Sequence, residues 1–216
     1  MNFAFQDNLS VQVAKWLAEK IIQTDYAAGS RIMEEKIATE LGISRGPIRE
    51  ALLILQKQRL VTILPRRGAL VKELTATEIK DLYEVIAALY TLLGTNVATQ
   101  WQNDQLTPLA NQLKLMQEHA KGKDYSAYFQ QTIEFIRLSY PIAKNRLLAE
   151  MIEDLIPSIY RVQYKSIQQR KINLKDHCKN YAEILSAAQE RNTHKIATVI
   201  LNFSQQQQQH ALASIE

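Results

Sequence analysis

The segment from Leu41 to Leu55, LGISRGPIREALLIL, places a tight turn directly before an amphipathic helix. Gly42 can adopt the left-handed conformation that ends a helix, and the preceding pattern predicts a short helix over about 34–41. Ser44 is a favourable N-cap, and Pro47 falls in the first turn of the next helix, where its missing N–H is harmless. The sequence therefore predicts two helices joined by a tight turn.

The second of these helices has two different faces. Arg45 and Arg49 are four positions apart and share one face. A guanidinium group can bind O6 and N7 of guanine with two hydrogen bonds, and a helix N-terminus attracts phosphate. Gly46 lacks a side chain and permits close approach to a duplex. The opposite face carries apolar residues, namely Ile48, Ala51, Leu52 and Leu55. This layout is typical of a helix-turn-helix that binds double-stranded DNA.

A predicted hairpin follows the two helices. The segment LVTILPRRGALVKEL indicates two short strands around 65–68, with Arg66 and Arg67 at the tip, where they can reach the DNA backbone or minor groove. Seven basic residues and one acidic residue lie between Ser44 and Lys72, a net charge of +6, whereas the whole chain carries only +4. This concentration of positive charge favours a nucleic-acid partner.

The region from about Ser10 to Leu74 resembles the winged helix-turn-helix of the GntR family of bacterial transcription regulators. The resemblance is strongest in the block SRGPIREAL, which begins at Ser44. It implies a homodimer on a palindromic operator. Some relatives carry an arginine in the second helix that also contacts DNA, but Glu35 occupies that place here, so this contact is not expected. The residues expected at DNA are Ser44, Arg45, Gly46, Arg49, Arg66, Arg67 and Gly68.

The DNA-binding interpretation requires a particular orientation of the two arginines of the predicted helix. The guanidinium groups of Arg45 and Arg49 have to project into solvent. Side chains turned inward, or bound by acidic residues of the same subunit, would contradict it.

From Leu74 onward the pattern is helical throughout. Thr75 and Glu78 predict a capping box at the start of a first long helix, and the domain boundary is placed here, giving domains 1–74 and 75–216. The fold class is therefore mainly α, with a winged helix-turn-helix before an all-α bundle of six helices. The five further helices are predicted at about 108–120, 125–140, 146–169, 174–190 and 193–211.

The second part is similar to the effector-binding FCD domain of the FadR-like branch of that family, in its six-helix VanR-like version. Relatives commonly hold a divalent metal ion with one aspartate and three histidines. Here the aligned positions are Thr132, Ile136, Tyr181 and a position near Phe203, so no metal or other cofactor is expected. His177 lies one helical turn before Tyr181, which leaves a non-standard metal site open.

The expected effector pocket is apolar and aromatic. It suits a larger or less charged small molecule. Arg137 and Arg161 either pair with an organic acid or lie on the surface, so an acidic effector stays open. Tyrosines at helical spacing are equally typical of a core or a dimer interface. The candidate residues are Tyr128, Thr132, Ile136, Tyr160, Arg161, Tyr164, Tyr181 and Phe203.

The predicted function is a ligand-responsive regulator, by default a repressor. One alternative is a DNA-binding protein whose helical part only dimerises. An enzyme is not expected, because the sequence has no nucleophile elbow, phosphate loop or zinc-binding helix motif. The single cysteine, the lack of a signal-peptide pattern and the shortness of the apolar run 85–93 predict a cytoplasmic protein without a membrane partner.

Overall fold

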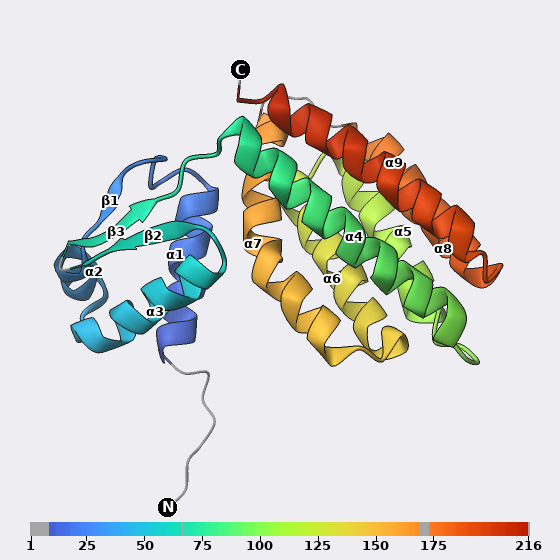
Figure 1. Cartoon of the computed structure of the whole chain (residues 1–216), viewed down its shortest axis with the longest axis horizontal. Helices are drawn as coiled ribbons and strands as arrows, with labels where there is room; N and C mark the ends of the chain where they lie inside the picture. The colour runs from blue at the N-terminus through green and yellow to red at the C-terminus, as the bar shows by residue number, and fades with distance from the viewer. Residues whose placement is uncertain (1–8, 66, 169–172, 216) are drawn as a thin grey trace, which may run out of the picture. The chain divides into compact units, whose positions relative to one another are not determined.

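The computed structural model describes residues 9–65, 67–168 and 173–215 of the chain (Figure 1). These residues divide into two compact units. The first contains the described residues up to Leu74 together with Asp154–Tyr164, and the second contains Thr75–Glu153 and the described residues from Lys165 onward. Within the described ranges, no helix combines the length and the apolar character that a bilayer span requires.

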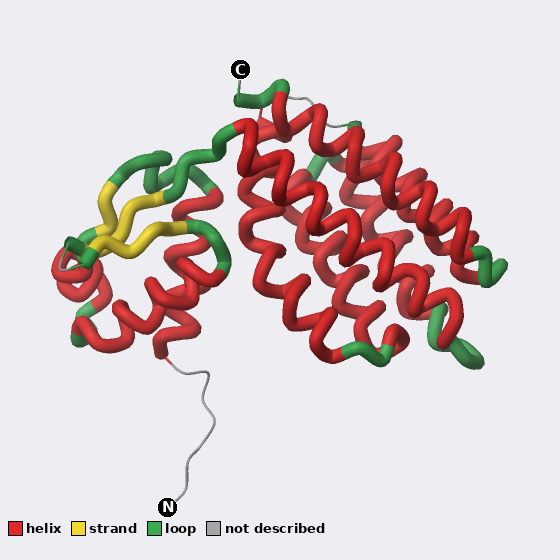
Figure 2. Tube along the Cα trace, viewed as in Figure 1, coloured by secondary structure: helices red, strands yellow, loops and turns green. Residues whose placement is uncertain are grey.

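The first unit combines a helix-turn-helix with a small antiparallel sheet, whose strands are drawn in yellow in Figure 2. Helix α1 packs against α3, and their apolar side chains lie in one buried cluster. The predicted helices and hairpin are confirmed. The third strand, β1, was not predicted because it is only two residues long. The elements are α1 (Leu9–Ile22), β1 (Arg31–Ile32), α2 (Glu34–Leu41), α3 (Arg45–Lys57), β2 (Val61–Leu64) and β3 (Gly68–Val71), with sheet order β1-β3-β2.

The turn between α2 and α3 has the expected backbone. Gly42 is left-handed, with φ of 65°, and its N–H donates to the carbonyl of Ala38. Ser44 occupies the N-cap position of α3 with an extended backbone, but its side chain makes no capping hydrogen bond, so the prediction of a hydroxyl cap is wrong. The start of α3 therefore depends on backbone conformation and on Pro47 in the first turn.

Gly68 opens β3 and is required by the sheet itself. Its φ is +80°, and a Cβ atom at this position would overlap the carbonyl oxygen of Ile32 on β1. Only glycine adopts this conformation without strain, and only glycine leaves space for the neighbouring strand. The residue expected at DNA thus has a structural role in holding β1 against β3.

The second unit is built from long helices. Helix α4 packs against α9, α6 and α8, while α5 packs against α6 and α8. All six predicted helices are confirmed, with ends shifted by a few residues, and the Thr75–Glu78 capping box is present. Helix α5 ends at Gly122, and the residue after it, Lys123, is left-handed with φ of 56°. The helices are α4 (Ala76–Gln100), α5 (Thr107–Gly122), α6 (Tyr125–Ala143), α7 (Arg146–Gln168), α8 (Leu174–Gln189) and α9 (Thr193–Leu212), the middle of α7 being grouped with the first unit.

Replacement of Gly68 tests the role of this residue in the sheet. Gly68→Ala should lower the free energy of unfolding by about 1–3 kcal/mol, because alanine is strained at positive φ and its methyl group overlaps β1. Gly46→Ala is the matched control, since a Cβ built at Gly46 meets no described atom within 4 Å apart from adjacent residues and the backbone of its own helix. Urea unfolding followed by circular dichroism measures both variants. Equal stability of the two would contradict the structural role of Gly68.

Candidate nucleic-acid interface and effector site

Helix α3 presents one face to solvent and buries the other. The side chains of Arg45 and Arg49 are 54% and 66% exposed, whereas Ile48 between them is fully buried. Ser44 and Gly46 are also exposed at the start of the helix. The predicted separation of a basic face from an apolar face is confirmed, because the apolar face packs into the cluster shared with α1.

Both arginines are bound by glutamates of the same subunit. Nη2 of Arg45 lies 2.9 Å from Oε1 of Glu35, and Nε of Arg49 lies 2.7 Å from Oε2 of Glu34. The expectation that these guanidinium groups carry no acidic partner is therefore wrong. The physical reason is the packing of α2 against α3, which brings the two carboxylates of the first turn of α2 next to the exposed face of α3.

These ion pairs leave the arginines available to DNA. The Arg45–Glu35 pair is exposed on both sides, and such a pair contributes only about 0–1 kcal/mol, so a phosphate or a base edge can displace the carboxylate of Glu35. The carboxylate that binds Arg49 is less exposed, because the side chain of Glu34 is only 22% exposed. The bond from Arg49 uses Nε, and the two terminal nitrogens can still form the fork that binds guanine. Acidic partners within the subunit are thus compatible with DNA binding, because the Glu35 pair is exposed and the bond to Glu34 uses Nε of Arg49.

The tip of the β2–β3 hairpin holds Arg67 next to a second arginine, Arg31. Arg67 is exposed, and its carbonyl oxygen accepts a hydrogen bond of 2.6 Å from Nε of Arg31. Arg31 lies on β1, opposite Leu70 of β3, so the sheet holds it beside the tip. Sequence reasoning missed Arg31 because the basic window began at Ser44. Arg66 lies outside the described residues.

In the second unit, aromatic side chains from three helices meet in a group called here the aromatic cluster. The ring centroid of His177 lies 4.5 Å from that of Phe203, and Tyr181 lies 5.7 Å from Phe203. The hydroxyl of Tyr128 is 2.8 Å from Nδ1 of His177. The predicted residues Tyr128, Tyr181 and Phe203 are therefore brought together. The aromatic cluster consists of Tyr128 and Phe129 on α6, His177 and Tyr181 on α8, and Phe203 on α9.

Two further predicted pocket residues are buried on the same helix as Tyr128. Thr132 donates a hydrogen bond of 2.7 Å from its hydroxyl to the carbonyl of Phe129, and Ile136 is buried one turn further along α6. Tyr160 and Tyr164 contact each other on α7, with ring centroids 6.3 Å apart. Arg161, which follows Tyr160 in the sequence, is buried. These three residues are grouped with the first unit, so the candidate effector site is described by the other five.

Phe129 and His177 are the two residues of the aromatic cluster that the predicted pocket omitted, and His177 is the polar one. For His177, burial and hydrogen bonding decide what the cluster can offer a ligand. His177 is 2% exposed, and burial lowers its pKa to about 3, so the imidazole is neutral. Its Nε2 atom is buried and makes no hydrogen bond within the described part of the chain. Burial also raises the pKa values of Tyr128 and Tyr181, so their hydroxyl groups stay protonated. The cluster therefore offers neutral polar groups in an apolar surrounding.

Among the residues that the structure describes, no group of three or more His, Cys, Asp or Glu side chains comes together as a metal-binding set.

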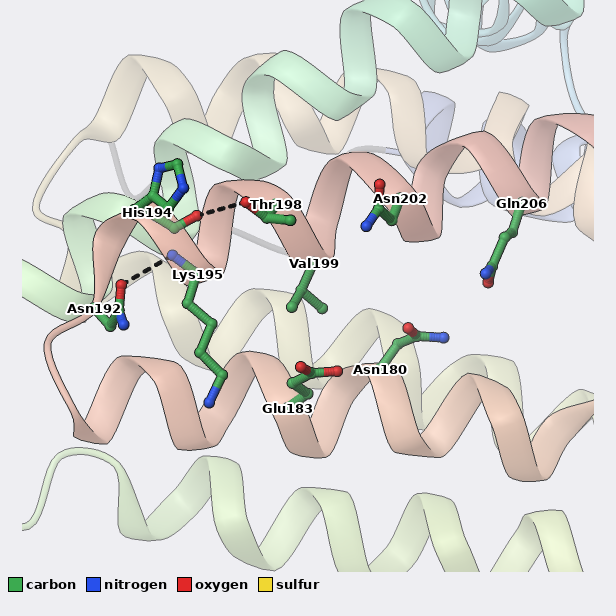
Figure 3. Close-up of a pocket in the computed structure, with 9 residues that line it drawn as sticks. All are labelled: Asn180, Glu183, Asn192, His194, Lys195, Thr198, Val199, Asn202 and Gln206. Carbon is green, nitrogen blue, oxygen red and sulfur yellow. Dashed lines mark hydrogen bonds between the residues drawn. The ribbon is translucent and has the colours of Figure 1, made fainter.

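A separate open pocket of about 530 Å³ lies along α8 and α9 (Figure 3). Some of its polar groups stabilise α9: the side chain of Asn192 caps the helix by accepting a hydrogen bond from the N–H of Lys195. None of the predicted effector residues lines it. The lining residues are Asn180, Glu183, Asn192, His194, Lys195, Thr198, Val199, Asn202 and Gln206.

The buried imidazole makes stability depend on pH. Between about pH 6.5 and pH 3 the unfolded chain binds a proton on His177 that the folded protein does not bind. The free energy of unfolding therefore falls on acidification, by at most about 1.4 kcal/mol per pH unit from this group. His177→Gln should show a smaller loss of stability than the wild type between about pH 7 and pH 5.

Urea unfolding at several pH values measures this difference. His194→Gln, which replaces an exposed histidine of α9 outside the aromatic cluster, is the control for the loss of an imidazole group. The same pH dependence in the wild type and in His177→Gln would show that the imidazole is not held neutral by burial.

Comparison with known protein families gives a match in each part of the chain. Residues 9–71 match the family described as bacterial regulatory proteins, gntR family. Residues 81–205 match the FCD domain. The two matched ranges contain, respectively, the helix-turn-helix with its hairpin and the aromatic cluster.

Three similar proteins of named organisms are transcription regulators. The HTH-type transcriptional regulator YdhC of Bacillus subtilis is 26% identical over 178 residues, covering 81% of this chain and 80% of the relative. The HTH-type transcriptional repressor RspR of Escherichia coli is 24% identical over 184 residues, covering 84% and 79%. The gluconate operon transcriptional repressor of Bacillus licheniformis is 34% identical over 125 residues, but this covers only 58% of the chain and 51% of the relative.

Solved structures resemble the whole chain. The McbR/YncC protein of E. coli superimposes with a TM-score of 0.81 at 20% identity, covering 98% of this chain and all of that one. A GntR transcriptional regulator from Rhodococcus sp. RHA1 gives a TM-score of 0.74 at 23% identity, covering 94% and 97%. At these identities the similarity establishes the fold alone.

Proposed function

Since this chain belongs to the GntR family of bacterial transcription regulators and carries an FCD domain, we propose that it is a ligand-responsive repressor that binds a palindromic operator as a homodimer. Residues 1–74 bind DNA, and residues 75–216 bind the effector and dimerise. The observation that carries the proposal is the exposure of Arg45 and Arg49 on the first turns of α3. The named relatives are regulators, which points away from an enzyme. We place its action in the cytoplasm, where operator DNA is found.

The proposed contacts divide between bases and phosphates. Arg45 and Arg49 bind guanine edges in the major groove, while Ser44 and Gly46 allow the start of α3 to approach the backbone. Arg67 at the hairpin tip binds phosphate or enters the neighbouring minor groove. In a homodimer the two copies of α3 have to lie roughly 34 Å apart to enter successive major grooves.

Dimerisation is supported by an apolar face on α4. Val85 and Leu92 are large, exposed and two helical turns apart, so they lie on one side of the helix. Exposed apolar side chains at this spacing favour burial against another surface. A second copy of the same helix, related by a two-fold axis, presents the same residues and satisfies the symmetry of a palindromic operator.

Effector binding is supported by the chemistry of the aromatic cluster. Apolar rings together with the neutral imidazole of His177 and the hydroxyls of Tyr128 and Tyr181 suit an aromatic or largely apolar small molecule with one hydrogen-bonding group. If this molecule binds better to a dimer with another spacing of its α3 helices, it lowers operator affinity. The coupling free energy equals that difference, typically about 1–3 kcal/mol.

The alternative function is a regulator whose helical part only dimerises. The burial of Tyr128, Thr132 and Tyr181 favours it, because side chains packed in this way are also typical of a core that binds nothing. The two functions share the DNA-binding part and differ in whether a small molecule changes the stability of the protein.

Arginine substitutions test DNA binding on the duplex that the wild type selects from a random pool. Arg49→Ala should weaken binding to this duplex by about 1–3 kcal/mol, because it removes a base contact. Arg67→Ala should weaken binding to selected and unrelated duplexes alike and reduce the slope of log K against log salt by about one. Lys114→Ala, on the exposed side of α5, is the charge-matched control. Unchanged binding by Arg49→Ala would refute its proposed role.

A screen of small molecules by thermal unfolding tests effector binding. A true effector at about 100 times its Kd should stabilise the protein by about 2.7 kcal/mol and should lower operator affinity. Tyr181→Phe should weaken this stabilisation, because it removes one hydroxyl from the cluster, whereas Tyr164→Phe on α7 should not. If no compound stabilises the protein, and protein purified from its host releases no ligand, the result would favour the alternative function, in which the helical part only dimerises.

A further inference from the structure

The structure places a carboxylate beside an arginine that is proposed to contact DNA. We propose that Glu35 is a specificity-determining residue: its carboxylate competes with DNA phosphate for Arg45 and weakens binding to non-operator DNA more than binding to the operator. This inference rests on the DNA binding proposed above. It adds an acidic residue of α2 to a surface otherwise described by its basic residues.

The first support is the exposure of the Glu35–Arg45 pair. The side chain of Glu35 is 70% exposed and that of Arg45 is 54% exposed, with 2.9 Å between the charged atoms. A pair in this environment contributes about 0–1 kcal/mol to stability, so it opens readily and folding does not require it. Glu34 differs, because its side chain is only 22% exposed where it meets Arg49. Glu35 can therefore respond to DNA without a change in the fold.

The second support is the position of the carboxylate relative to an incoming phosphate. A phosphate that pairs with Arg45 has to come close to the carboxylate of Glu35, which lies within hydrogen-bonding distance of the same guanidinium group. Two like charges about 4 Å apart repel by about 1 kcal/mol in bulk water and more near a protein surface. Binding through phosphate alone is therefore weakened at this arginine.

The consequence differs between the two kinds of DNA. Binding to unrelated sequences depends almost entirely on phosphate contacts, whereas operator binding adds hydrogen bonds to base edges. At the operator, Arg45 can leave Glu35 for a guanine edge and recover the lost hydrogen bond. A repulsive group that reduces binding to the wrong partner more than binding to the right one increases specificity.

The test compares Glu35→Gln with Glu40→Gln, which removes the same charge from the exposed last turn of α2. Affinity is measured on the duplex selected by the wild type and on a scrambled duplex, over a range of salt concentrations. Glu35→Gln should bind the scrambled duplex about fivefold more tightly, with a salt slope steeper by about one, and should change operator affinity less. Glu40→Gln should leave the ratio of the two affinities unchanged.

A double-mutant cycle shows whether the effect acts through Arg45. In an Arg45→Gln background, Glu35→Gln should change binding to the scrambled duplex no more than Glu40→Gln does. Thermal unfolding of each variant is measured alongside, and Glu35→Gln should match the wild type. An operator-to-scrambled ratio that is the same in Glu35→Gln and the wild type would overturn the inference. If the wild type selects no DNA sequence at all, the proposed function itself fails.

Discussion

The buried apolar face of α3 is the constraint on which the DNA-binding surface depends. Ile48, Leu52 and Leu55 are buried in the cluster shared with α1. Each such side chain stabilises the fold by about 1.5–3 kcal/mol, several times the contribution of an exposed ion pair. The core therefore sets the rotation of α3 about its axis. Because Arg45 and Arg49 lie on the other face, they are held toward solvent whether or not the glutamates of α2 bind them.

The count of basic residues alone does not describe the electrostatics of the DNA-binding surface, because acidic residues pair with some of them. The segment from Ser44 to Lys72 carries a net charge of +6. However, Glu34 and Glu35 of α2 form ion pairs with the first two arginines of this segment, Arg49 and Arg45 respectively. The sheet adds Arg31 beside the hairpin tip. The surface thus combines strong general attraction for DNA with local acidic partners that have to be displaced. The aromatic cluster of the other unit contrasts with it, because burial keeps His177 and its neighbouring tyrosines neutral.

The sequence was sufficient wherever a feature is local. The limits of α2 and the capping box of α4 follow from residues within a few positions of each other. Features that join distant segments could not be predicted. Strand β1 is defined only by its pairing with β3, the bond between Tyr128 and His177 joins residues 49 positions apart, and the two ion pairs depend on how α2 packs against α3. Helical spacing likewise could not predict that Tyr160 and Tyr164 are grouped with the first unit, because spacing shows which face of a helix a residue lies on and not what that face packs against.

The central claim is that the exposed start of α3 lies in the major groove and binds guanine. Methylation interference on the selected duplex tests it most directly, because a methyl group on N7 of guanine blocks a major-groove contact, while a methyl group on N3 of adenine lies in the minor groove. We predict two clusters of interfering guanines, with their centres about one helical turn apart, on one side of the duplex. Binding that is unaffected by methylation at N7 of guanine would contradict the account.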